Sequence, residues 1–494
     1  MVDHIQGIPR DQTFLLPNTI EQYVQKYSPV KFINAYINKL DMEKLGFTHA
    51  IPQENGAPSY DPKDLTKLYL YGGLNHIRSS RTLERECQTN TEAIWLLKGL
   101  KPDFKTIADF RHDNADAIGA LFKEFVAFLK DLSLYGAQQI TVDGCKLKAV
   151  NSIDKDFNQK TLAKRIKLME KSVTRYLEEL DATDEQEAAD DKQTATEVEE
   201  QAKAFQVDKV AALLEKRDKC EELLGKMQKR DQKEVAFTDP ECRLMKNHGK
   251  IEPCYNVQAA VDAKNHLIVD YKVTNEASDV NLLSEVAISA KQTLGVERID
   301  CISDKGYFDS LQIKKCVDNG VVPYVAVKKC SPGPGQCGVP SVEFTAEMFT
   351  YDKSADVYVC PGGQHLLFYC STVRKGMDMR LYKCREGVCS SCEFFMTRCT
   401  KNRGGRVILR WVHQEVIDEM RQRLRLHPEV MDERKKIAEH PFGTIKRAFG
   451  AGYLLLKGLR RVGGEVGLLM IAYNLRRALN ILGVEALMQA FVKV

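Results

Sequence analysis

The chain has 494 residues, of which 44% are apolar and 28% are charged, an ordinary composition for a soluble protein of several domains. No apolar run is long enough to span a bilayer, and the first residues lack the pattern of a signal peptide, so we expect neither a membrane protein nor a secreted one. We expect a cytoplasmic protein whose 15 cysteines are reduced thiols or metal ligands rather than disulfides.

The net charge of +4 is an average over oppositely charged regions. Residues 178–200 are strongly acidic, whereas residues 401–477 contain 17 Lys and Arg against 8 Asp and Glu. A basic surface favours a polyanionic partner, because neutralising phosphates releases condensed counterions. An ordinary solvated helix face explains the same excess equally well. Charge alone therefore leaves a nucleic-acid partner as one of two interpretations.

Residues 1–135 predict an all-helical N-terminal domain. Apolar residues recur at helical spacing, and Lys101-Pro102 marks a break between helices. Three basic side chains, Arg78, Arg81 and Arg85, cluster along one helical stretch. A small helical domain with basic residues near its turns is typical of DNA binding and equally of plain packing, so both interpretations stay open.

A strand pattern begins at residues 136–158 and resumes at 241–328. The segment ITVDGCKLKAV is apolar and β-branched, and two further strands flank an expected hairpin turn at 262–265. They are followed by a helix from about Asp279 to Leu294, a strand, a helix and another strand. Three sequential strands followed by this alternation predict an α/β (mixed α+β) fold, a mixed sheet with flanking helices.

Two insertions interrupt this predicted core. Residues 159–240 are rich in Lys, Glu, Ala, Leu and Gln and nearly free of Gly and Pro, which indicates a helical hairpin or coiled coil. Residues 329–404 are rich in Gly and Cys and contain short strand-like pieces, such as VEFTAEMFTYD and ADVYVC, which indicates a small β-rich module. Residues 405–494 predict C-terminal helices that return to the core.

Three carboxylates are candidates for phosphodiester chemistry, which needs two hard cations held about 4 Å apart by a few oxygen ligands. Asp143 interrupts an apolar strand, where Asp is disfavoured, although Asp-Gly also begins many hairpin turns. Asp304 ends a predicted strand, where ligand-binding groups gather in open α/β sheets, although it is equally suited to capping a helix. Asp262 lies in a predicted turn, where Asp is common, so we rank it below Asp304.

Glu439 is the third candidate carboxylate. Lys446 follows it by seven residues, or two turns of a continuous helix, so the two side chains would share one face. Pro441 stands between them and suits only a first helical turn or a kink. A salt-bridged surface helix is the alternative interpretation.

The strings ITVDGCKLKAV, TDPECRLMKNHG, YNVQAAVDAKNHLIVDYKVTNEASD, ISDKGYFDS, EHPFGTIKR and VGLLMIAYNLRRALN, in this order, closely resemble the DDE transposases of bacterial insertion sequences. The strings YDPKDLTKLYLYGGLNHIRSSRTLERECQTN and DFKTIADFR resemble the helical N-terminal domain of that group. The resemblance covers most of the chain. It implies an RNase H-like catalytic core and places the metal-binding triad of the family at Asp143, Asp304 and Glu439.

The same resemblance implies an activity. Such transposases use two Mg²⁺ (or Mn²⁺) ions per active site to cut double-stranded DNA at the terminal inverted repeats of a mobile element, and they join the freed 3′-hydroxyl to target DNA. We expect endonuclease and strand-transfer activity by at least a homodimer on DNA, associated with the nucleoid when bound. The alternatives are a catalytically silent DNA-binding derivative and an RNase H-like nuclease that joins no strands.

Residues around Glu439 match the family only in part. Related transposases often carry a Tyr and an Arg before the Glu and a Lys after it. Lys446 fits the last position and, with Arg447, is a candidate DNA contact. Arg434 fits the Arg position roughly, but Lys435 has the usual spacing and Asp432 stands in place of the Tyr. This departure leaves open whether cleavage passes through a hairpin DNA intermediate.

Four cysteines form a separate pattern, C-x4-C-x2-C-x6-C, at Cys384, Cys389, Cys392 and Cys399. Four thiolates suit tetrahedral zinc, and the inner C-x2-C is a usable knuckle. The spacing is irregular and lacks a second C-x2-C, so reduced, partly buried thiols are the alternative to a structural zinc site. Cys360 and Cys370 precede the pattern.

Overall fold

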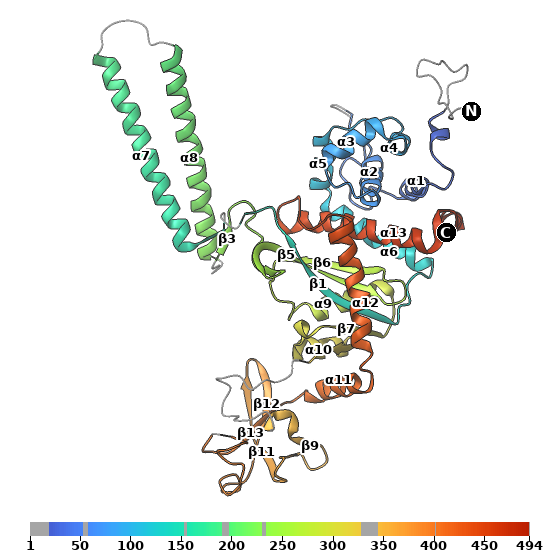
Figure 1. Ribbon diagram of the computed structural model, residues 1–494, viewed down its shortest axis with the longest axis vertical. Helices are drawn as coiled ribbons and strands as arrows, with labels where there is room; N and C mark the ends of the chain where they lie inside the picture. The colour runs from blue at the N-terminus through green and yellow to red at the C-terminus, as the bar shows by residue number, and fades with distance from the viewer. Residues whose placement is uncertain are drawn as a thin grey trace, which may run out of the picture. The chain divides into compact units, whose positions relative to one another are not determined.

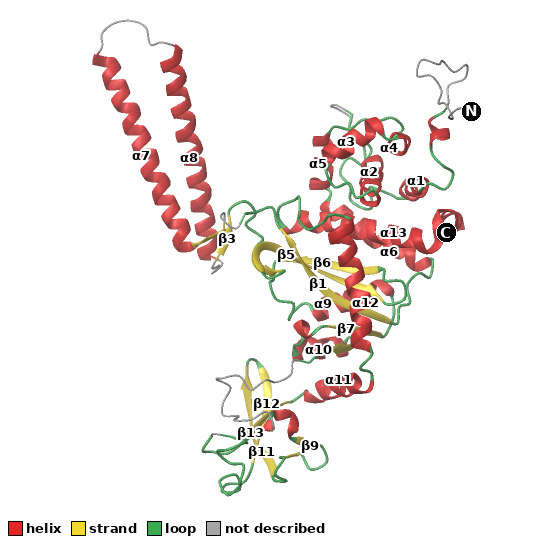
Figure 2. Ribbon diagram, viewed as in Figure 1, coloured by secondary structure: helices red, strands yellow, loops and turns green. Residues whose placement is uncertain are grey.

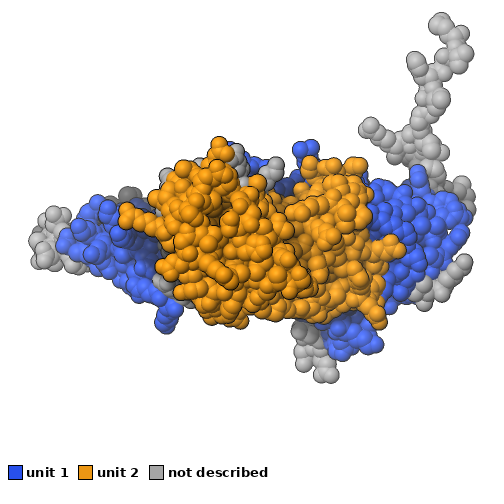
Figure 3. All heavy atoms as spheres, turned by 90° about the horizontal axis from the view of Figure 1, so that it is seen from below, with its two compact units in different colours: residues 1–136, 143–277, 437–494 blue, residues 137–142, 278–436 orange. Residues whose placement is uncertain are grey.

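The computed structural model describes residues 19–52, 58–152, 156–189, 197–229, 234–327, 344–400 and 402–493 (Figure 1). These ranges contain helices and strands in a mixed α/β arrangement (Figure 2). The chain divides into two compact units (Figure 3). Unit 1 comprises residues 1–136, 143–277 and 437–494, and unit 2 comprises residues 137–142 and 278–436.

The first part of unit 1 is helical, as predicted. Ser28, Asp61 and Asp103 each stand just before a helix and accept a backbone N–H from its first turn, which is the local signal that starts the helix. The predicted break at Lys101-Pro102 is confirmed, because it lies between two helices. The helices are η1 (Ile20–Tyr23), α1 (Pro29–Lys39), α2 (Pro62–Leu74), α3 (Ser80–Thr89), α4 (Thr91–Leu96), α5 (Phe104–Asp113) and α6 (Ala115–Asp131).

The C-terminal helix α13 (Leu459–Lys493) packs closely on two of these helices. A Cβ added to Gly464 would lie 2.6 Å from the backbone of Ala115 on α6, and one added to Gly73 on α2 would lie 2.5 Å from the Ala472 side chain. Glycine at these positions therefore permits the contact. In the described ranges no helix combines the length and the apolar character that crossing a bilayer requires.

Strand β5 (Lys250–Asp262) is the centre of the sheet in unit 1. It pairs with β1 (Gln139–Lys148) and is antiparallel to β4 (Arg243–Asn247) and β6 (Ile268–Thr274). The predicted β5–β6 hairpin is confirmed. Asp262, however, is the last residue of β5 and is fully buried, and its carboxylate accepts the backbone N–H groups of Gly136 and Lys264. This aspartate therefore holds the end of the strand in place.

In unit 2 the first residues of β1 pair in parallel with β7 (Ile299–Ser303), which pairs in parallel with β8 (Val321–Val325). Helices α9 (Leu283–Leu294) and α10 (Ser310–Asp318) alternate with these strands. The predicted order of helix, strand, helix and strand is thus confirmed, although α9 begins four residues later than expected. Parallel pairs here and antiparallel pairs in unit 1 make the predicted mixed α/β fold class.

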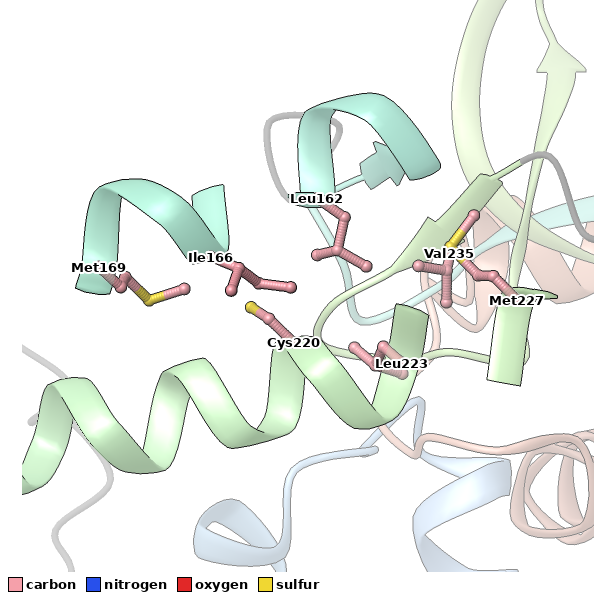
Figure 4. Packing of buried hydrophobic residues seen from close by; sticks show 7 residues of the cluster. All are labelled: Leu162, Ile166, Met169, Cys220, Leu223, Met227 and Val235. Atoms are coloured by element: carbon pink, nitrogen blue, oxygen red, sulfur yellow. The ribbon is translucent and has the colours of Figure 1, made fainter. Parts of the chain in front are cut away.

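The insertion after β1 consists of two long helices, α7 (Gln159–Ala189) and α8 (Glu197–Lys229), as predicted. A two-stranded ribbon of β2 (Asp156–Asn158) and β3 (Glu234–Ala236) joins their bases. A cluster of buried apolar side chains fills the space between helices and ribbon (Figure 4). Its members are Leu162, Ile166, Met169, Cys220, Leu223, Met227 and Val235. The base of the hairpin thus has an apolar core of its own.

The Cys-rich segment of unit 2 forms a five-stranded antiparallel sheet in the order β13-β12-β11-β10-β9. The strands are β9 (Thr350–Asp352), β10 (Val357–Val359), β11 (His365–Arg374), β12 (Met377–Lys383) and β13 (Val407–Trp411). The predicted β-rich character is confirmed, but two details were wrong. The 3₁₀ turn η5 (Ala346–Met348) lies where a strand was expected, and the longest hairpin, β11–β12, was missed. Most of β11 is exposed, so it lacks an alternating apolar pattern.

Helices α11 (Gln414–Leu426) and α12 (Val430–Gly443) precede the π-helix η6 (Thr444–Ala448). Pro441 lies inside α12, and helical backbone continues past it into η6. The condition for a shared face of Glu439 and Lys446, a continuous α-helix between them, is therefore not met. A π-helix closes its hydrogen bonds over five residues instead of four, which changes the relative direction of side chains on either side of it.

Candidate active site

Asp143 lies in the middle of β1, and its side chain is partly exposed. One carboxylate oxygen accepts the backbone N–H of Gly144 at 2.9 Å. Cys145 follows two residues later, so both side chains project from the same face of the strand. Asp143 therefore presents its carboxylate beside a buried thiol.

The ammonium group of Lys446, on η6, reaches this face of β1. Its charge and its hydrogen bond to the thiol lower the pKa of Cys145, but burial outweighs them and raises that pKa to about 11. Lys446 Nζ also lies 3.4 Å from His248 Nε2, in the turn between β4 and β5. The structure thus places a positive charge against Cys145, two residues from Asp143. Sequence reasoning selected Lys446 but missed its contacts with Cys145 and His248.

Arg78 fixes the loop that follows η6. It lies between α2 and α3 and donates to the carbonyl oxygens of Gly450 at 2.8 Å and Tyr453 at 2.6 Å. It also forms an ion pair with Glu465 on α13 at 2.9 Å. Its guanidinium therefore links the loop after η6 both to α13 and to the segment between α2 and α3.

Glu465 completes this anchor. It is 3% exposed, and besides Arg78 it accepts the backbone N–H groups of Leu455 and Leu456. In the same loop Leu454 donates its N–H to the carbonyl of Lys148, the last residue of β1, at 2.8 Å. The loop is thus tied to β1 at one point and to α13 at another, which positions the π-helix that carries Lys446.

The other arginines that we considered as DNA contacts are Arg81, Arg85, Arg434 and Arg447. The Arg81 guanidinium lies over the Phe104 ring, 4.9 Å from its centre, on an exposed part of the helical region. Arg85 and Arg447 are exposed, and Arg434 in unit 2 is partly buried. Arg78 alone of the three N-terminal arginines has its donors directed at backbone and carboxylate oxygens of the protein itself.

Asp304 lies in unit 2, directly after β7, and caps the short 3₁₀ turn η3 (Lys305–Tyr307). Its carboxylate accepts the backbone N–H of Gly306 at 2.7 Å and is partly exposed. A Cβ added to Gly306 would stand 2.8 Å from that carboxylate oxygen, so glycine is needed for this arrangement. Asp304 therefore lies at the end of β7 and also caps η3.

Glu439 is exposed on α12, and its neighbour His440 contacts α13. His440 Nδ1 lies 2.8 Å from the hydroxyl of Tyr473, which donates to the carbonyl of His266. Burial, followed by the charge of Arg477, lowers the pKa of His440. These contacts attach the end of α12 to α13 and to the turn before β6.

The string IAYNLRRALN in α13 has a structural role that explains its polar residues. Asn474 accepts the N–H of Ile268 and donates to the carbonyl of the same residue, both at 2.8 Å. Arg477 donates to the carbonyl of Asn265 at 2.9 Å. These hydrogen bonds hold the β5–β6 hairpin against α13. The polar residues of the string IAYNLRRALN therefore serve packing between α13 and the sheet.

Among the described residues, no group of three or more His, Cys, Asp or Glu side chains has the arrangement of a formed metal site. Five thiols nevertheless line one small cavity of about 30 Å³ in the β module of unit 2. They belong to Cys360, Cys384, Cys389, Cys392 and Cys399. Burial raises the pKa of the Cys384 thiol to about 12, and its hydrogen bond with Cys389 acts in the same direction. The cavity therefore includes one cysteine, Cys360, that the spacing pattern left out.

Two family models match the chain. One, described as "Transposase domain (DUF772)", covers residues 18–113, and the other, described as "Transposase DDE domain", covers residues 226–475, just over half of the chain. The second range contains Asp304, Glu439 and Lys446, whereas Asp143 lies before it. Helices α1 to α5 lie within the first range.

A search of curated protein sequences found no match. Among solved structures, the chain is similar to the cryo-EM structure of piggyBac transposase in a synaptic complex with hairpin DNA. The identity is 9% and the TM-score is 0.33, with 94% of this chain and 80% of the other covered. We draw no conclusion from a likeness at this level.

Proposed function

Because the chain belongs to the DDE transposase family, we propose that this transposase cuts double-stranded DNA at the ends of a bacterial insertion sequence and joins those ends to target DNA. The match to the Transposase DDE domain over residues 226–475 is the observation that carries the proposal. Both reactions are in-line phosphoryl transfers, so one active site is able to serve them.

We assign the metal-binding role to Asp143, Asp304 and Glu439. Carboxylate oxygens are the ligands that Mg²⁺ and Mn²⁺ prefer, so the donor set fits two such ions. The ions would activate the attacking oxygen and stabilise the leaving oxygen. Two observations support the choice of aspartates. Asp143 is partly exposed and directly follows three buried residues of β1, and Asp304 directly follows the parallel strand β7.

Lys446 is assigned to binding the DNA phosphate next to the scissile bond. Its ammonium group lies against the Cys145 thiol, two residues from Asp143, so a phosphate bound there would approach the Asp143 carboxylate. An ammonium group is a compact point charge that suits this task. Gly306 supports the site differently, by donating its N–H to Asp304 and so limiting the orientations of that carboxylate.

Basic side chains outside the site are assigned to the DNA backbone. They are Arg81, Arg85, Arg434 and Arg447, of which Arg81, Arg85 and Arg447 are exposed. Contacts of this kind contribute affinity that does not depend on base sequence and falls with salt. Cutting both ends of an element requires two active sites, so we propose that the protein acts as a homodimer on DNA.

A plasmid assay tests the activity. The substrate is a supercoiled plasmid that carries the coding sequence with its flanking DNA, incubated with purified protein and Mg²⁺. We expect nicks in the flanking DNA with the unchanged protein, and none with Asp143→Asn or Asp304→Asn. If the unchanged protein binds the flanking DNA but never cuts it, a catalytically silent DNA-binding protein is the better description.

A second assay separates transposition from simple hydrolysis. Pre-cut fragments that end at the nicks found above are mixed with a circular target plasmid. A transposase joins the fragment to the circle, whereas an RNase H-like nuclease only shortens the fragment. Failure to join with an otherwise active preparation would restrict the function to cleavage.

A further inference from the structure

The β module of unit 2 encloses a cavity that is lined by sulfur atoms. Its volume of about 30 Å³ is enough for a single small guest. The five cysteines around it come from two separate parts of the module: Cys360 from the β10–β11 turn, and the others from residues 384–399 after β12. Antiparallel pairing of β11 with β12 brings these two parts together.

Cys360 has the surroundings of a metal-binding knuckle. In the turn Cys360-Pro361-Gly362-Gly363-Gln364, the Sγ atom accepts the backbone N–H of Gln364 at 3.2 Å. Gly363 has φ +75, which permits the tight turn that directs this N–H at the sulfur. A backbone N–H directed at a sulfur is a contact of the kind that orients metal-binding side chains.

The second group of sulfurs is also closely surrounded by backbone. Gly405 has φ +86, and a Cβ added there would lie 3.1 Å from both Cβ and Sγ of Cys389. The N–H of Cys392 donates to the carbonyl of Cys389 at 3.2 Å, so the C-x2-C segment forms a turn. Both cysteines of this turn line the same cavity as Cys360.

A buried cation accompanies the thiols. Arg406 lines the cavity together with the five thiols. Its Nε is buried without a hydrogen-bond partner among the residues that the structure describes. A buried N–H of this kind ordinarily finds an acceptor. Four thiolates around a divalent ion carry a net charge of about −2, and a guanidinium beside them would supply both compensation and a donor.

We propose that this cavity is a structural zinc site with Cys360, Cys389, Cys392 and Cys399 as its ligands. Zn–S bonds of about 2.3 Å would draw the four thiolates together around the centre of the cavity. This ligand set differs from the one that spacing alone suggested, since Cys360 replaces Cys384. Cys384 also lines the cavity, but at 9% exposure it is a buried member of the apolar cluster of Phe349, Tyr358, Leu366, Tyr382 and Ile408. Cys360, Cys389 and Cys399 are only partly buried against this cluster.

A zinc ion in this cavity would stabilise the β module. Among the described residues, its apolar cluster has six buried members, which is a small core for a five-stranded sheet. Small modules of this kind commonly need a bound metal or disulfides for stability. Zinc would join the β10–β11 turn to the segment after β12, the two parts of the chain that enclose the cavity.

The zinc content of the full-length chain tests the proposal. The protein is purified with a reducing agent, dialysed against metal-free buffer and analysed by elemental mass spectrometry. We expect about one zinc ion per chain for the unchanged protein and for Cys384→Ser, and a severalfold lower content for Cys360→Ser. Cys370→Ser is the matched control, because Cys370 is on β11 but does not line the cavity within the described module. Its zinc content should equal that of the unchanged protein.

The outcomes decide both the metal and the ligands. An unchanged protein without zinc, whose thiols all react with a thiol reagent or form disulfides, overturns the proposal. Full zinc in Cys360→Ser combined with loss in Cys384→Ser overturns the ligand set. If Cys360→Ser is insoluble, Co²⁺ is substituted into the unchanged protein. The intense visible absorption of a tetrahedral cobalt–thiolate centre supports the site, and its absence contradicts it.

Discussion

Replacing Arg78 tests whether this arginine holds the protein together or contacts DNA. Its side chain is 14% exposed and that of its partner Glu465 is 3% exposed, so the ion pair is largely shielded from water. Arg78 also donates to the carbonyl oxygens of Gly450 and Tyr453. In Arg78→Ala these oxygens lose their donor, and Glu465 stays buried with only its two backbone donors.

The expected magnitude follows from these contacts. Removing one partner of a buried ion pair costs about 3–5 kcal/mol of folding free energy. Glu465 retains two N–H groups, so we expect the lower end, about 3 kcal/mol. If Arg78 instead contacts a DNA phosphate, Arg78→Ala should lose little stability. The slope of log affinity for DNA against log salt concentration should then change by about 1.

Two measurements on the same variants separate these outcomes. Urea unfolding gives the stability, and binding to a duplex DNA of arbitrary sequence at several salt concentrations gives the slope. Arg81→Ala is the matched control, because the Arg81 guanidinium is exposed over Phe104 and its loss should cost no more than about 1 kcal/mol. A lower salt slope for Arg78→Ala with unchanged urea midpoint would refute the positioning role.

Three further predictions concern single residues. Gly306→Ala should lower DNA cleavage at least about tenfold with unchanged DNA affinity, because its Cβ would displace the Asp304 carboxylate 2.8 Å away; equal cleavage rates would contradict this. Gly467→Ala should lower the free energy of unfolding by about 1–3 kcal/mol in urea unfolding, since its Cβ would lie 2.5 Å from the Tyr271 hydroxyl. Gly225→Ala on α8, open within 4 Å among the described residues, should instead raise that free energy by about 0.5–1 kcal/mol. His440 has a pKa lowered from 6.5, so the unfolded chain binds its proton more tightly and the folded state loses stability as pH falls below about 6.5. His440→Gln should flatten that decline in urea unfolding, and an unchanged pH slope would count against it.

The fold class was predictable because its signals are local. Strand β1 and the β5–β6 hairpin carry apolar, β-branched runs, and the α7–α8 insertion has one Gly and no Pro between residues 159 and 229. The strand β11 was missed because most of its side chains are exposed, so no alternation marks it. The π-helix η6 was missed for another reason: its residues are also compatible with an ordinary α-helix.

The sequence supplies candidate residues for the site, but it does not supply their contacts. Lys446 was selected by spacing, whereas its contact with Cys145 depends on a loop that Arg78 and Glu465 hold from distant parts of the chain. The charge of Arg78 would suit a DNA phosphate as well as it suits the Glu465 carboxylate. The sequence alone does not distinguish a buried arginine from an exposed one. Cys360 offered a usable signal, a Cys-Pro-Gly-Gly turn, that counting cysteine spacings alone overlooked.

The central claim is that Asp143, Asp304 and Glu439 bind the metal ions that cut DNA. Cysteine substitution tests it directly, because a thiolate is a poor ligand for Mg²⁺ and a better one for softer divalent ions such as Mn²⁺. Asp143→Cys, Asp304→Cys and Glu439→Cys are assayed for nicking of the plasmid with each metal. We predict that each variant loses cleavage with Mg²⁺ and regains part of it with Mn²⁺, whereas the matching Ala variants stay inactive with both. A Cys variant that cleaves normally with Mg²⁺ would remove that residue from the metal site.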